Sequence, residues 1–485
     1  MRASPAGSAR AGDARLCALW VLAAVSLLAT LAIAGAQTKP NAANPDAALI
    51  ERGRYLALAG DCQACHTIDQ SKQMAGGYAV PTPFGTIYTP NITPDQGTGI
   101  GRWSDADFVR AMHQGLGKNG ENLYPAFPYD SFTLLSRDDV LAIKAYLISL
   151  PPIHNVVPAN ALGFPFNQRW ILAGWKLFNF HDGRFRPDAG KSAQWNRGAY
   201  LVQALEHCGT CHSPRNFTMG TENNRKLAGG AVGAWSSYNI TPDKVSGIGA
   251  WSEHDIQSYL ATGIAPGKAW AAGPMGEAVE HSLSQLQPAD VQAIVSYLRD
   301  QPTIAGGGET APRFDYGHPA HYEAGLRGAN GLSRSANAGS GAELYSANCA
   351  SCHGDKGTGS ADGTFPPLLH NTSVGAPAPN NLVMVIVNGM QRQTAHDDAF
   401  MPAFDRLDDN QVATLASYVE GQFGDPTVHV TADQVSAFRK GLGPSPPYLA
   451  IGIGIAAGVV LLVVVIFLAL RRPWRRRASK QAVQH

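Results

Sequence analysis

Two long apolar stretches lie near the ends of this 485-residue chain. The first, residues 16–33, follows three arginines and precedes Ala-Gly-Ala at 34–36. A basic start, an apolar stretch and small residues, in this order, are typical of a secretory leader. We therefore expect residues 1–36 to be a signal peptide, with an uncleaved N-terminal anchor as the alternative. Either would export the rest of the chain.

The second apolar stretch, residues 448–470, contains no charged residue and is long enough to cross a bilayer as a tilted helix. Five arginines and one lysine follow it, with no acidic residue before the C-terminus. Basic tails stay on the cytoplasmic side of a membrane. The pattern therefore predicts a transmembrane helix at 448–470, a cytoplasmic tail at 471–485, and a single-pass protein of the inner membrane whose other domains face the periplasm.

Between these stretches, apolar residues recur with the spacing of amphipathic helices, as in Val140, Ile143 and Leu147. Closing helices are predicted at 137–150, 288–300 and 409–422, and opening helices at 47–59, 195–205 and 342–347. Ser136 with Asp139, and Asp408 with Gln411, have the spacing in which a side-chain oxygen caps the first turn of a helix. The chain is therefore predicted to be all-α.

The chain also repeats itself. Asn-Ile-Thr-Pro-Asp occurs at 91–95 and again at 239–243, and each copy is followed by Gly-Ile-Gly-x-Trp-Ser, at 99–104 and 247–252. A fixed offset of this kind indicates related structural units. We predict two closely related domains and a third, shorter domain without this insert.

The repeats give the following expected organisation. Domains are predicted at 37–155, 193–304 and 336–426, with connecting segments at 156–192, 305–335 and 427–447. The segment 156–192 is rich in aromatic residues and is too apolar for a free linker. We expect it to be a strap between the first two domains, with a docking surface for a partner as the alternative. The Gly- and Ser-rich segment 305–335 is expected to be a flexible tether.

Three copies of Cys-x-x-Cys-His contain every cysteine except Cys17, which lies in the expected leader. This motif is the attachment signal of c-type haem: two thiols add to the porphyrin vinyl groups, and the histidine binds the iron from below. The sequence therefore predicts three covalent haem c groups. The predicted thioether cysteines are Cys62, Cys65, Cys208, Cys211, Cys349 and Cys352, and the predicted proximal iron ligands are His66, His212 and His353.

Two other interpretations of the cysteines are weaker. A zinc site built from paired Cys-x-x-Cys units would use two motifs and leave the third without a role. A disulfide within each motif would not require the histidine that follows it. A formal net charge of +1 and 15% charged residues argue against a nucleic-acid partner.

The second axial ligand of such iron is usually a methionine sulfur on a loop after the motif. Met401, in Phe-Met-Pro-Ala-Phe, and Met275, in Gly-Pro-Met, both lie shortly before a predicted closing helix. We expect them to bind the irons of the third and second haems. In the first domain, the position that corresponds to Met275 is Phe127, which has no lone pair to offer.

The first haem is therefore expected to be either open at its sixth position or bound by another residue. The alternatives in that domain are His113, Met112 and Met74, and we favour the open or weakly bound state. Because methionine ligation raises the reduction potential of haem, its loss should lower the potential of the first haem.

These strings together resemble the tri-haem cytochrome c subunits of membrane-bound periplasmic dehydrogenases that oxidise alcohols, gluconate, sorbitol or aldehydes. The resemblance is carried by the repeated Asn-Ile-Thr-Pro-Asp and Gly-Ile-Gly-x-Trp-Ser strings, the aromatic strap, and Cys-His-Ser-Pro-Arg-Asn at 211–216. It implies three class I cytochrome c domains in tandem, followed here by the expected transmembrane helix. The string around Phe127 resembles cytochromes that accompany molybdenum-hydroxylase-type dehydrogenases.

The resemblance implies an electron-transfer subunit without catalytic residues of its own. Its expected partners are a periplasmic catalytic subunit of flavin, PQQ or molybdopterin type and, as acceptor, membrane ubiquinone or a terminal oxidase. The alternative is a haem peroxidase or oxidase acting at an open first haem. Such chemistry needs a distal acid–base group, for which His113 and His154 are the candidates.

Overall fold

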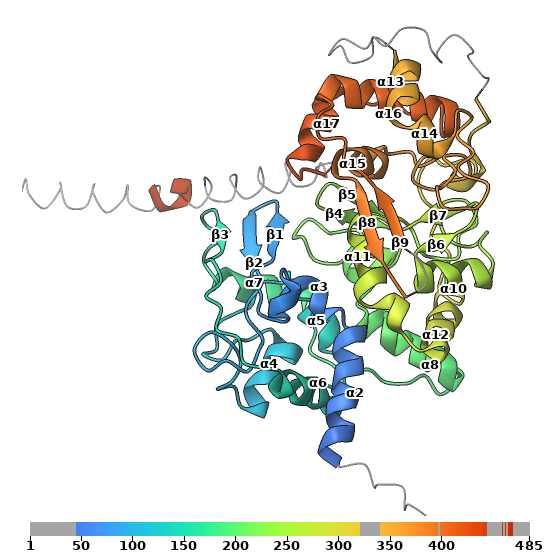
Figure 1. Cartoon of the computed structure of the whole chain (residues 1–485). Helices are drawn as coiled ribbons and strands as arrows, with labels where there is room; N and C mark the ends of the chain where they lie inside the picture. The colour runs from blue at the N-terminus through green and yellow to red at the C-terminus, as the bar shows by residue number, and fades with distance from the viewer. Residues whose placement is uncertain are drawn as a thin grey trace, which may run out of the picture. The chain divides into compact units, whose positions relative to one another are not determined.

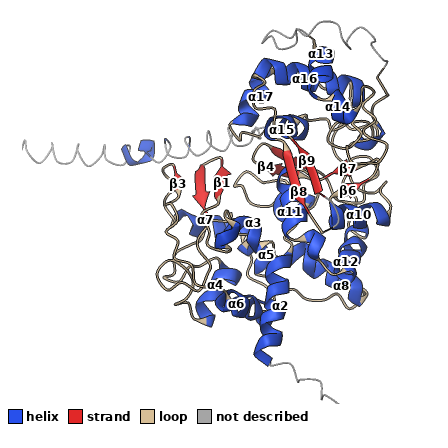
Figure 2. Ribbon diagram, in the orientation of Figure 1, coloured by secondary structure: helices blue, strands red, loops and turns tan. Residues whose placement is uncertain are grey.

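The computed structural model describes residues 45–320, 340–395, 398–443, 458, 461 and 464–468. Helices dominate this part of the chain, and short antiparallel strands lie between them (Figure 1, Figure 2). Residues 50–485 belong to one compact unit, so contacts from Ile50 onwards are described together. The expected signal peptide (1–36) and residues 321–335 of the expected tether (305–335) lie outside the described residues.

Repeat 1, defined here as residues 50–162, is built of helices that surround a small sheet. Its helices are α2 (Pro45–Ala59), α3 (Cys62–His66), α4 (Asp105–Gln114), α5 (Tyr129–Phe132) and α6 (Arg137–Ser149), with one 3-10 turn, η1 (Gln70–Lys72). Its strands are β1 (Ala79–Thr82), β2 (Gly85–Tyr88) and β3 (Ala161–Leu162), paired antiparallel in that order. Ala79 pairs with Tyr88, and Gly85 pairs with Leu162. A separate helix, α7 (Ile171–Asn179), lies in the strap.

Repeat 2, residues 193–304, has the same order of main helices. Its helices are α8 (Ala193–Tyr200), the π-helical η2 (Leu201–Leu205), α9 (Gly209–His212), α10 (Glu253–Thr262), α11 (Gly273–His281) and α12 (Pro288–Arg299), with 3-10 turns η3 (Asn223–Arg225) and η4 (Leu283–Gln285). Its strand pairs are β4 (Gly230–Val232) with β5 (Trp235–Ser237), and β6 (Ile264–Ala265) with β7 (Ala269–Trp270).

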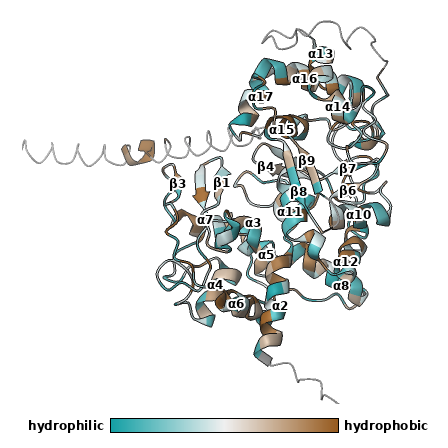
Figure 3. Ribbon diagram, in the orientation of Figure 1, coloured by the Kyte–Doolittle hydropathy of each residue, from teal (hydrophilic) through white to brown (hydrophobic). Residues whose placement is uncertain are grey.

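The C-terminal part, residues 340–443, is shorter and follows the turn η5 (Arg313–Asp315). Its helices are α13 (Gly341–Asn348), α14 (Ala350–His353), α15 (Asn380–Asn388), α16 (Asp409–Phe423) and α17 (Ala432–Arg439), and its hairpin joins β8 (Met390–Gln393) to β9 (Asp398–Met401). Helix α15 is largely apolar (Figure 3), and most of its side chains are buried.

Side-chain caps explain where several helices begin. Ser136 accepts a hydrogen bond from the backbone N–H of Asp139 at the start of α6, and Asp408 with Gln411 forms a complete capping box at α16. Both helix starts were predicted from the sequence and are confirmed. Ser104 and Ser252 begin α4 and α10 with the same kind of box, which satisfies backbone N–H groups that have no partner within the helix.

Glycines allow the opening and closing helices to cross closely. A Cβ atom at Gly53 would lie 1.8 Å from the carbonyl oxygen of Ala142, and one at Gly198 would lie 1.9 Å from that of Ala293. The side-by-side course of α8 and α12 is visible in Figure 1. Since any larger residue would push the helices apart, the crossing point requires glycine in both repeats.

The apolar core has two parts. One cluster joins buried side chains of repeats 1 and 2, including Leu147, Leu201 and Ile294. A second cluster fills the C-terminal part around Val412, Leu415 and Phe423. The first two repeats therefore share a core, whereas the third motif belongs to a core of its own.

The interface between repeats 1 and 2 is reciprocal. Tyr55 of repeat 1 donates to Asp290 Oδ2 at 2.6 Å, and Tyr200 of repeat 2 donates to Asp139. Each tyrosine also accepts a backbone N–H from the start of the other repeat's closing helix, at 3.2 Å for Tyr55 and 3.1 Å for Tyr200. In such an arrangement the same patch serves on both sides, as in a two-fold symmetric dimer.

An arginine supports each of the two aspartates from within its own repeat. Arg197 donates twice to Asp290, at 2.8 and 2.6 Å, and Arg52 donates once to Asp139, at 2.6 Å. Both aspartates are buried. The paired cation and the tyrosine hydroxyl provide the partners that a buried carboxylate needs.

Two sequence predictions about the architecture are wrong. The chain is not all-α, because short strands occur in all three parts. They were missed because they are two to four residues long and lie in turn-rich segments, where no alternating pattern can develop.

The predicted transmembrane helix and the single-pass inner-membrane localisation are also contradicted. Within the described residues, no helix has the length and apolar character needed to cross a bilayer. Within 448–470 the structure describes residues 464–468, which are helical. Apart from 458 and 461, the other residues of that stretch, and the tail at 471–485, lie outside the described residues.

Candidate haem sites

Each Cys-x-x-Cys-His motif ends on a short helix that presents its histidine in the same way. A backbone carbonyl oxygen contacts the Nδ1 atom of each histidine: Pro90 for His66 at 2.7 Å, Tyr238 for His212 at 2.7 Å, and Pro366 for His353 at 2.9 Å. Because a carbonyl only accepts, Nδ1 must carry the proton, which leaves the lone pair on Nε2. This is the tautomer that a metal-binding histidine requires.

The electrostatic environment of the three histidines agrees with this tautomer. Burial lowers the pKa of His66, His212 and His353 below the ordinary value, and the carbonyl contact opposes this shift without reversing it. A neutral imidazole is the form that binds a metal.

The six motif cysteines are free thiols in the structure. Burial raises the pKa of Cys62, Cys65 and Cys349 to about 12 and also raises that of Cys208 and Cys211. Among the described residues there is no group of three or more His, Cys, Asp or Glu side chains arranged to hold a metal ion. Both thiols of each motif are therefore available for thioether bonds.

A large cavity of about 2470 Å³ joins the first two motifs. Its walls include both cysteines and the histidine of each of these motifs, together with Met275 and Met401. Pockets for drug-sized ligands are usually about 300–1,000 Å³, so this space suits more than one large flat cofactor. The cysteines and histidine of the third motif are not among the described residues that line it.

The first two motifs lie close together along this cavity. Helix α3, which carries the first motif, packs against α11, which carries Met275. Burial is the main cause of the raised pKa of Cys65, and the nearby Asp61 and Glu277 add to it. The thiol of Cys211 in the second motif also contributes, so it lies near Cys65. Groups bound at these two motifs would therefore be neighbours.

The predicted methionines lie at the cavity wall. Met275 is in the first turns of α11, and Met401 ends strand β9, opposite Met390. Phe127 also lines the cavity, and like Met275 it is partly buried against the core shared by the two repeats. Phe127 and Met275 thus share the cavity and the core, but Met275 lies within α11, whereas Phe127 lies in the loop before α5 (Tyr129–Phe132).

Of the three other residues considered for the first iron, only Met112 lines the cavity. It is buried in the last turn of α4. Met74 is buried away from the lining, with a positive φ of 61°. His113 is also buried outside the lining, its Nε2 atom has no hydrogen-bond partner, and burial lowers its pKa to about 4.

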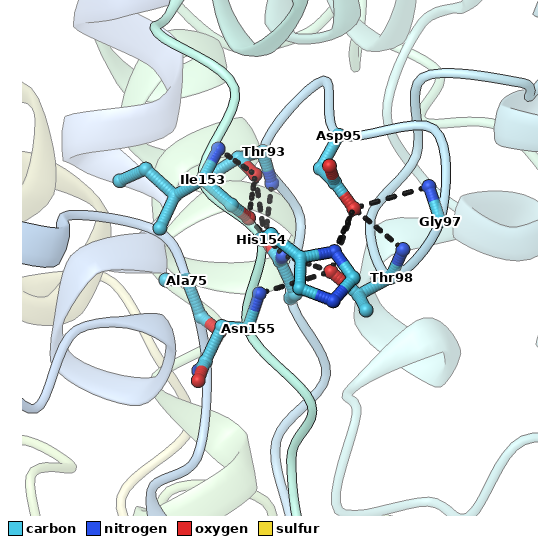
Figure 4. A network of polar contacts seen from close by, with 9 residues as sticks. Ala75, Thr93, Asp95, Gly97, Thr98, Ile153, His154 and Asn155 are labelled. Atoms are coloured by element: carbon cyan, nitrogen blue, oxygen red, sulfur yellow. Dashed lines mark hydrogen bonds and ion pairs between the residues drawn. The ribbon is translucent and has the colours of Figure 1, made fainter.

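The two residues considered as acid–base groups for peroxidase chemistry, His113 and His154, do not line the cavity. His154 is largely exposed and contacts Asp95 Oδ1 at 3.3 Å, within a network that also holds Thr98 (Figure 4). These two histidines therefore do not support the enzyme alternative.

Sequence reasoning missed a second group of lining residues, the cationic side chains. They could neutralise the propionate groups that a haem carries, and they are Lys118, Arg169, Arg215, Arg313 and Lys440. Arg215 donates to the backbone of Thr210 at 2.5 Å, and Arg313 lies 4.7 Å from the ring centre of Tyr238. The residues are scattered over the sequence, so no local pattern could have identified them.

His207 was also missed. It precedes Cys208 directly, lines the cavity, and adopts a positive φ of 39°. Its ring stacks edge-on against Phe132 of repeat 1 at 5.4 Å, and burial lowers its pKa to about 4. Its position beside the motif was the one available signal.

Comparisons with known proteins agree on one family. A family model described as cytochrome c matches residues 50–151 and 338–422. The chain is 40% identical over 477 residues to the fructose dehydrogenase cytochrome subunit of Gluconobacter japonicus, covering 94% of this chain and 97% of that protein. It is 35% identical over 410 residues to the gluconate 2-dehydrogenase cytochrome c subunit of Pantoea cypripedii, covering 81% and 90%. It is 35% identical over 441 residues to the cytochrome c subunit of the quinone alcohol dehydrogenase of Gluconacetobacter polyoxogenes, covering 88% and 90%.

Proposed function

Because this chain belongs to the family of cytochrome c subunits of fructose, gluconate and alcohol dehydrogenases, we propose that it passes electrons from a catalytic dehydrogenase subunit to a separate acceptor. Substrate oxidation then belongs to the partner chain, of flavin, PQQ or molybdopterin type. The acceptor is a membrane quinone such as ubiquinone, or a terminal oxidase.

The observation that carries the proposal is the common presentation of the three histidines. In each motif a carbonyl oxygen of the following loop fixes Nδ1, so that Nε2 is free for iron while both thiols are free for thioether bonds. Haem supplies one-electron redox chemistry. The protein holds the cofactor, orients its ligands and surrounds it with apolar walls.

We assign one haem c to each motif, which gives three per chain, in domains at 37–155, 193–304 and 336–426. The iron ligands are His66, His212 and His353 on one side, and Met275 and Met401 on the other side of the second and third haems. The first haem has Phe127 at the methionine position, and Met112 is the one sulfur of repeat 1 at the cavity wall. Residues 1–36 act as a cleaved leader.

Two arrangements in the structure support transfer between the first two haems. Their motifs share one cavity, and α3 packs against α11. The reciprocal Tyr–Asp contacts fix the two repeats relative to each other. A fixed, short separation is what a relay between two cofactors requires.

The proposal is tested with the holoprotein and its dehydrogenase subunit. Intact mass should correspond to three haems, and addition of the dehydrogenase substrate should reduce them and then reduce an added ubiquinone analogue. Haems that stay oxidised while the dehydrogenase reduces an artificial dye would contradict the function. A mass corresponding to fewer haems would contradict the count.

A further inference from the structure

Helix α7 of the strap places apolar side chains on the outside. Trp170 precedes the helix and is 73% exposed, while Leu177 and Phe178 are 77% and 74% exposed. Ala173 and Gly174 are exposed on the same face, since positions 170, 173, 174, 177 and 178 follow the helical period. A Cβ atom at Gly174 would meet nothing within 4 Å.

The opposite face of α7 holds the helix against the repeats with its polar atoms. Lys176 Nζ donates to the carbonyl oxygens of Gln114 and Gly115 at the end of α4, at 2.8 and 2.9 Å. Trp175 Nε1 donates to the carbonyl of Thr218 at 2.9 Å. Burial lowers the pKa of Lys176 to about 8. The inner face of α7 therefore combines the buried Leu172 with the half-buried cation of Lys176, while apolar side chains also cover the outer face, where an ordinary surface helix is polar.

The apolar surface continues onto the segment after the second motif. Phe217 is 72% exposed, and its neighbour Asn216 donates to Asn179 Oδ1 at the end of α7, at 2.9 Å. We call Trp170, Ala173, Gly174, Leu177, Phe178 and Phe217 the α7 patch. Exposed apolar clusters of this kind are uncommon on monomers and mark interaction sites, and interface centres are rich in Trp and Phe.

The α7 patch lies on the outside of a wall whose inside faces the cofactors. Trp175, in the same helix, lines the cavity that joins the first two motifs, and so does Arg169, just before Trp170. A protein seated on the α7 patch would be separated from the cavity by little more than one helix. An electron donor needs such a position, and a merely structural strap does not.

We propose that the α7 patch is the docking surface for the catalytic dehydrogenase subunit, whose contact surface is apolar where it meets Leu177 and Phe178. This rests on the proposed function, because membership of a dehydrogenase complex supplies the partner. The strap also holds repeats 1 and 2 together through Lys176 and Trp175, so one segment performs both roles that the sequence left open.

The test uses the full holoprotein in which Leu177 and Phe178 are replaced together by glutamate. The matched control is Val156→Glu, which changes a side chain that is 76% exposed and outside the patch. The probe is the affinity-tagged dehydrogenase subunit encoded in the same gene cluster, and the readouts are binding in a pull-down and the rate of haem reduction by substrate. Haem spectra and melting temperature verify that each variant is folded.

We expect the Leu177→Glu/Phe178→Glu variant to bind the tagged subunit at least tenfold more weakly and Val156→Glu to bind like the wild type. Equal binding by the double variant would overturn the docking surface. The docking surface would also be overturned if the double variant bound the subunit normally but no longer bound phosphatidylethanolamine–phosphatidylglycerol vesicles. That result would assign the patch to lipid. If the wild type binds the subunit without being reduced, the proposed function fails, and the loss of binding still decides the docking surface.

Discussion

Repeats 1 and 2 are two versions of one scaffold that differ at the position expected to bind iron. Both begin α4 or α10 with a serine–aspartate capping box, both cross their first and last helices at a glycine, and both fix the motif histidine with a carbonyl oxygen. They also exchange equivalent tyrosine–aspartate contacts. Yet repeat 2 has Met275 where repeat 1 has Phe127.

The comparison separates what builds the fold from what sets the redox chemistry. Phe127 and Met275 pack against the same core and line the same cavity, so either side chain satisfies the packing. A sulfur ligand, in contrast, raises the potential of haem and fills its sixth position. Under the proposed ligand assignment the two repeats would differ in the properties of their cofactors. The local structure differs as well, because Met275 lies within α11 and Phe127 lies in the loop before α5.

The largest effect is expected for Met275→Leu. Loss of the sulfur should lower the potential of the second haem by on the order of 0.1 V, a fraction of the roughly 0.8 V over which axial ligands act. Potentiometric titration of the holoprotein measures this shift. Phe127→Leu is the matched control and should leave all potentials nearly unchanged; a comparable drop in that variant would break the comparison.

The reverse change, Phe127→Met, should raise the potential of the first haem by a smaller amount, because the loop has not been shaped to hold a sulfur at bonding distance. The same titration and the ferric spectrum report the result. Met112→Leu serves as the second arm. If it alone converts the first haem to a high-spin form, Met112 already occupies the sixth position, and the open state favoured here is wrong.

The reciprocal interface should respond symmetrically to Tyr55→Phe and Tyr200→Phe. Each change removes a hydrogen bond to a buried carboxylate and should cost about 1–3 kcal/mol of unfolding free energy. Urea denaturation of each single variant gives the values. Costs that differ by more than about 1 kcal/mol between the two would mean that the contacts are not equivalent.

The smallest effect concerns pH. Burial alone would raise the pKa of Asp290, but the hydrogen bonds from Arg197 and Tyr55 lower it overall. A depressed folded-state pKa stabilises the protein above the ordinary pKa of aspartate, and this contribution is lost as the pH falls through the folded value. Melting temperatures measured from neutral to acidic pH should therefore fall less steeply in Asp290→Asn than in the wild type. Asp138→Asn, at an exposed position, should show the wild-type slope.

Local patterns were sufficient for part of this structure. The capping residues Ser136 and Asp408 predicted where α6 and α16 begin. The family also followed from short strings, and the comparisons bear it out. These features depend on residues that are near in sequence or copied at a fixed offset.

Features that depend on distant residues could not be predicted. The inward direction of Lys176 depends on carbonyl groups at the end of α4, which lie 62 and 61 residues away in the sequence. The apolar stretch at 448–470 led to the prediction of a membrane span from its length and hydropathy, and no helix among the described residues fits such a span.

The most direct test of the account is the ferric absorption spectrum of the holoprotein, in particular the weak long-wavelength band of methionine-bound ferric haem. We predict a band with the intensity of two methionine-bound haems, which is halved in Met275→Ala and likewise halved in Met401→Ala, together with a high-spin contribution from the first haem. A spectrum in which all three haems are low-spin and the band keeps its intensity in Met275→Ala would contradict the assignment of ligands to the two repeats.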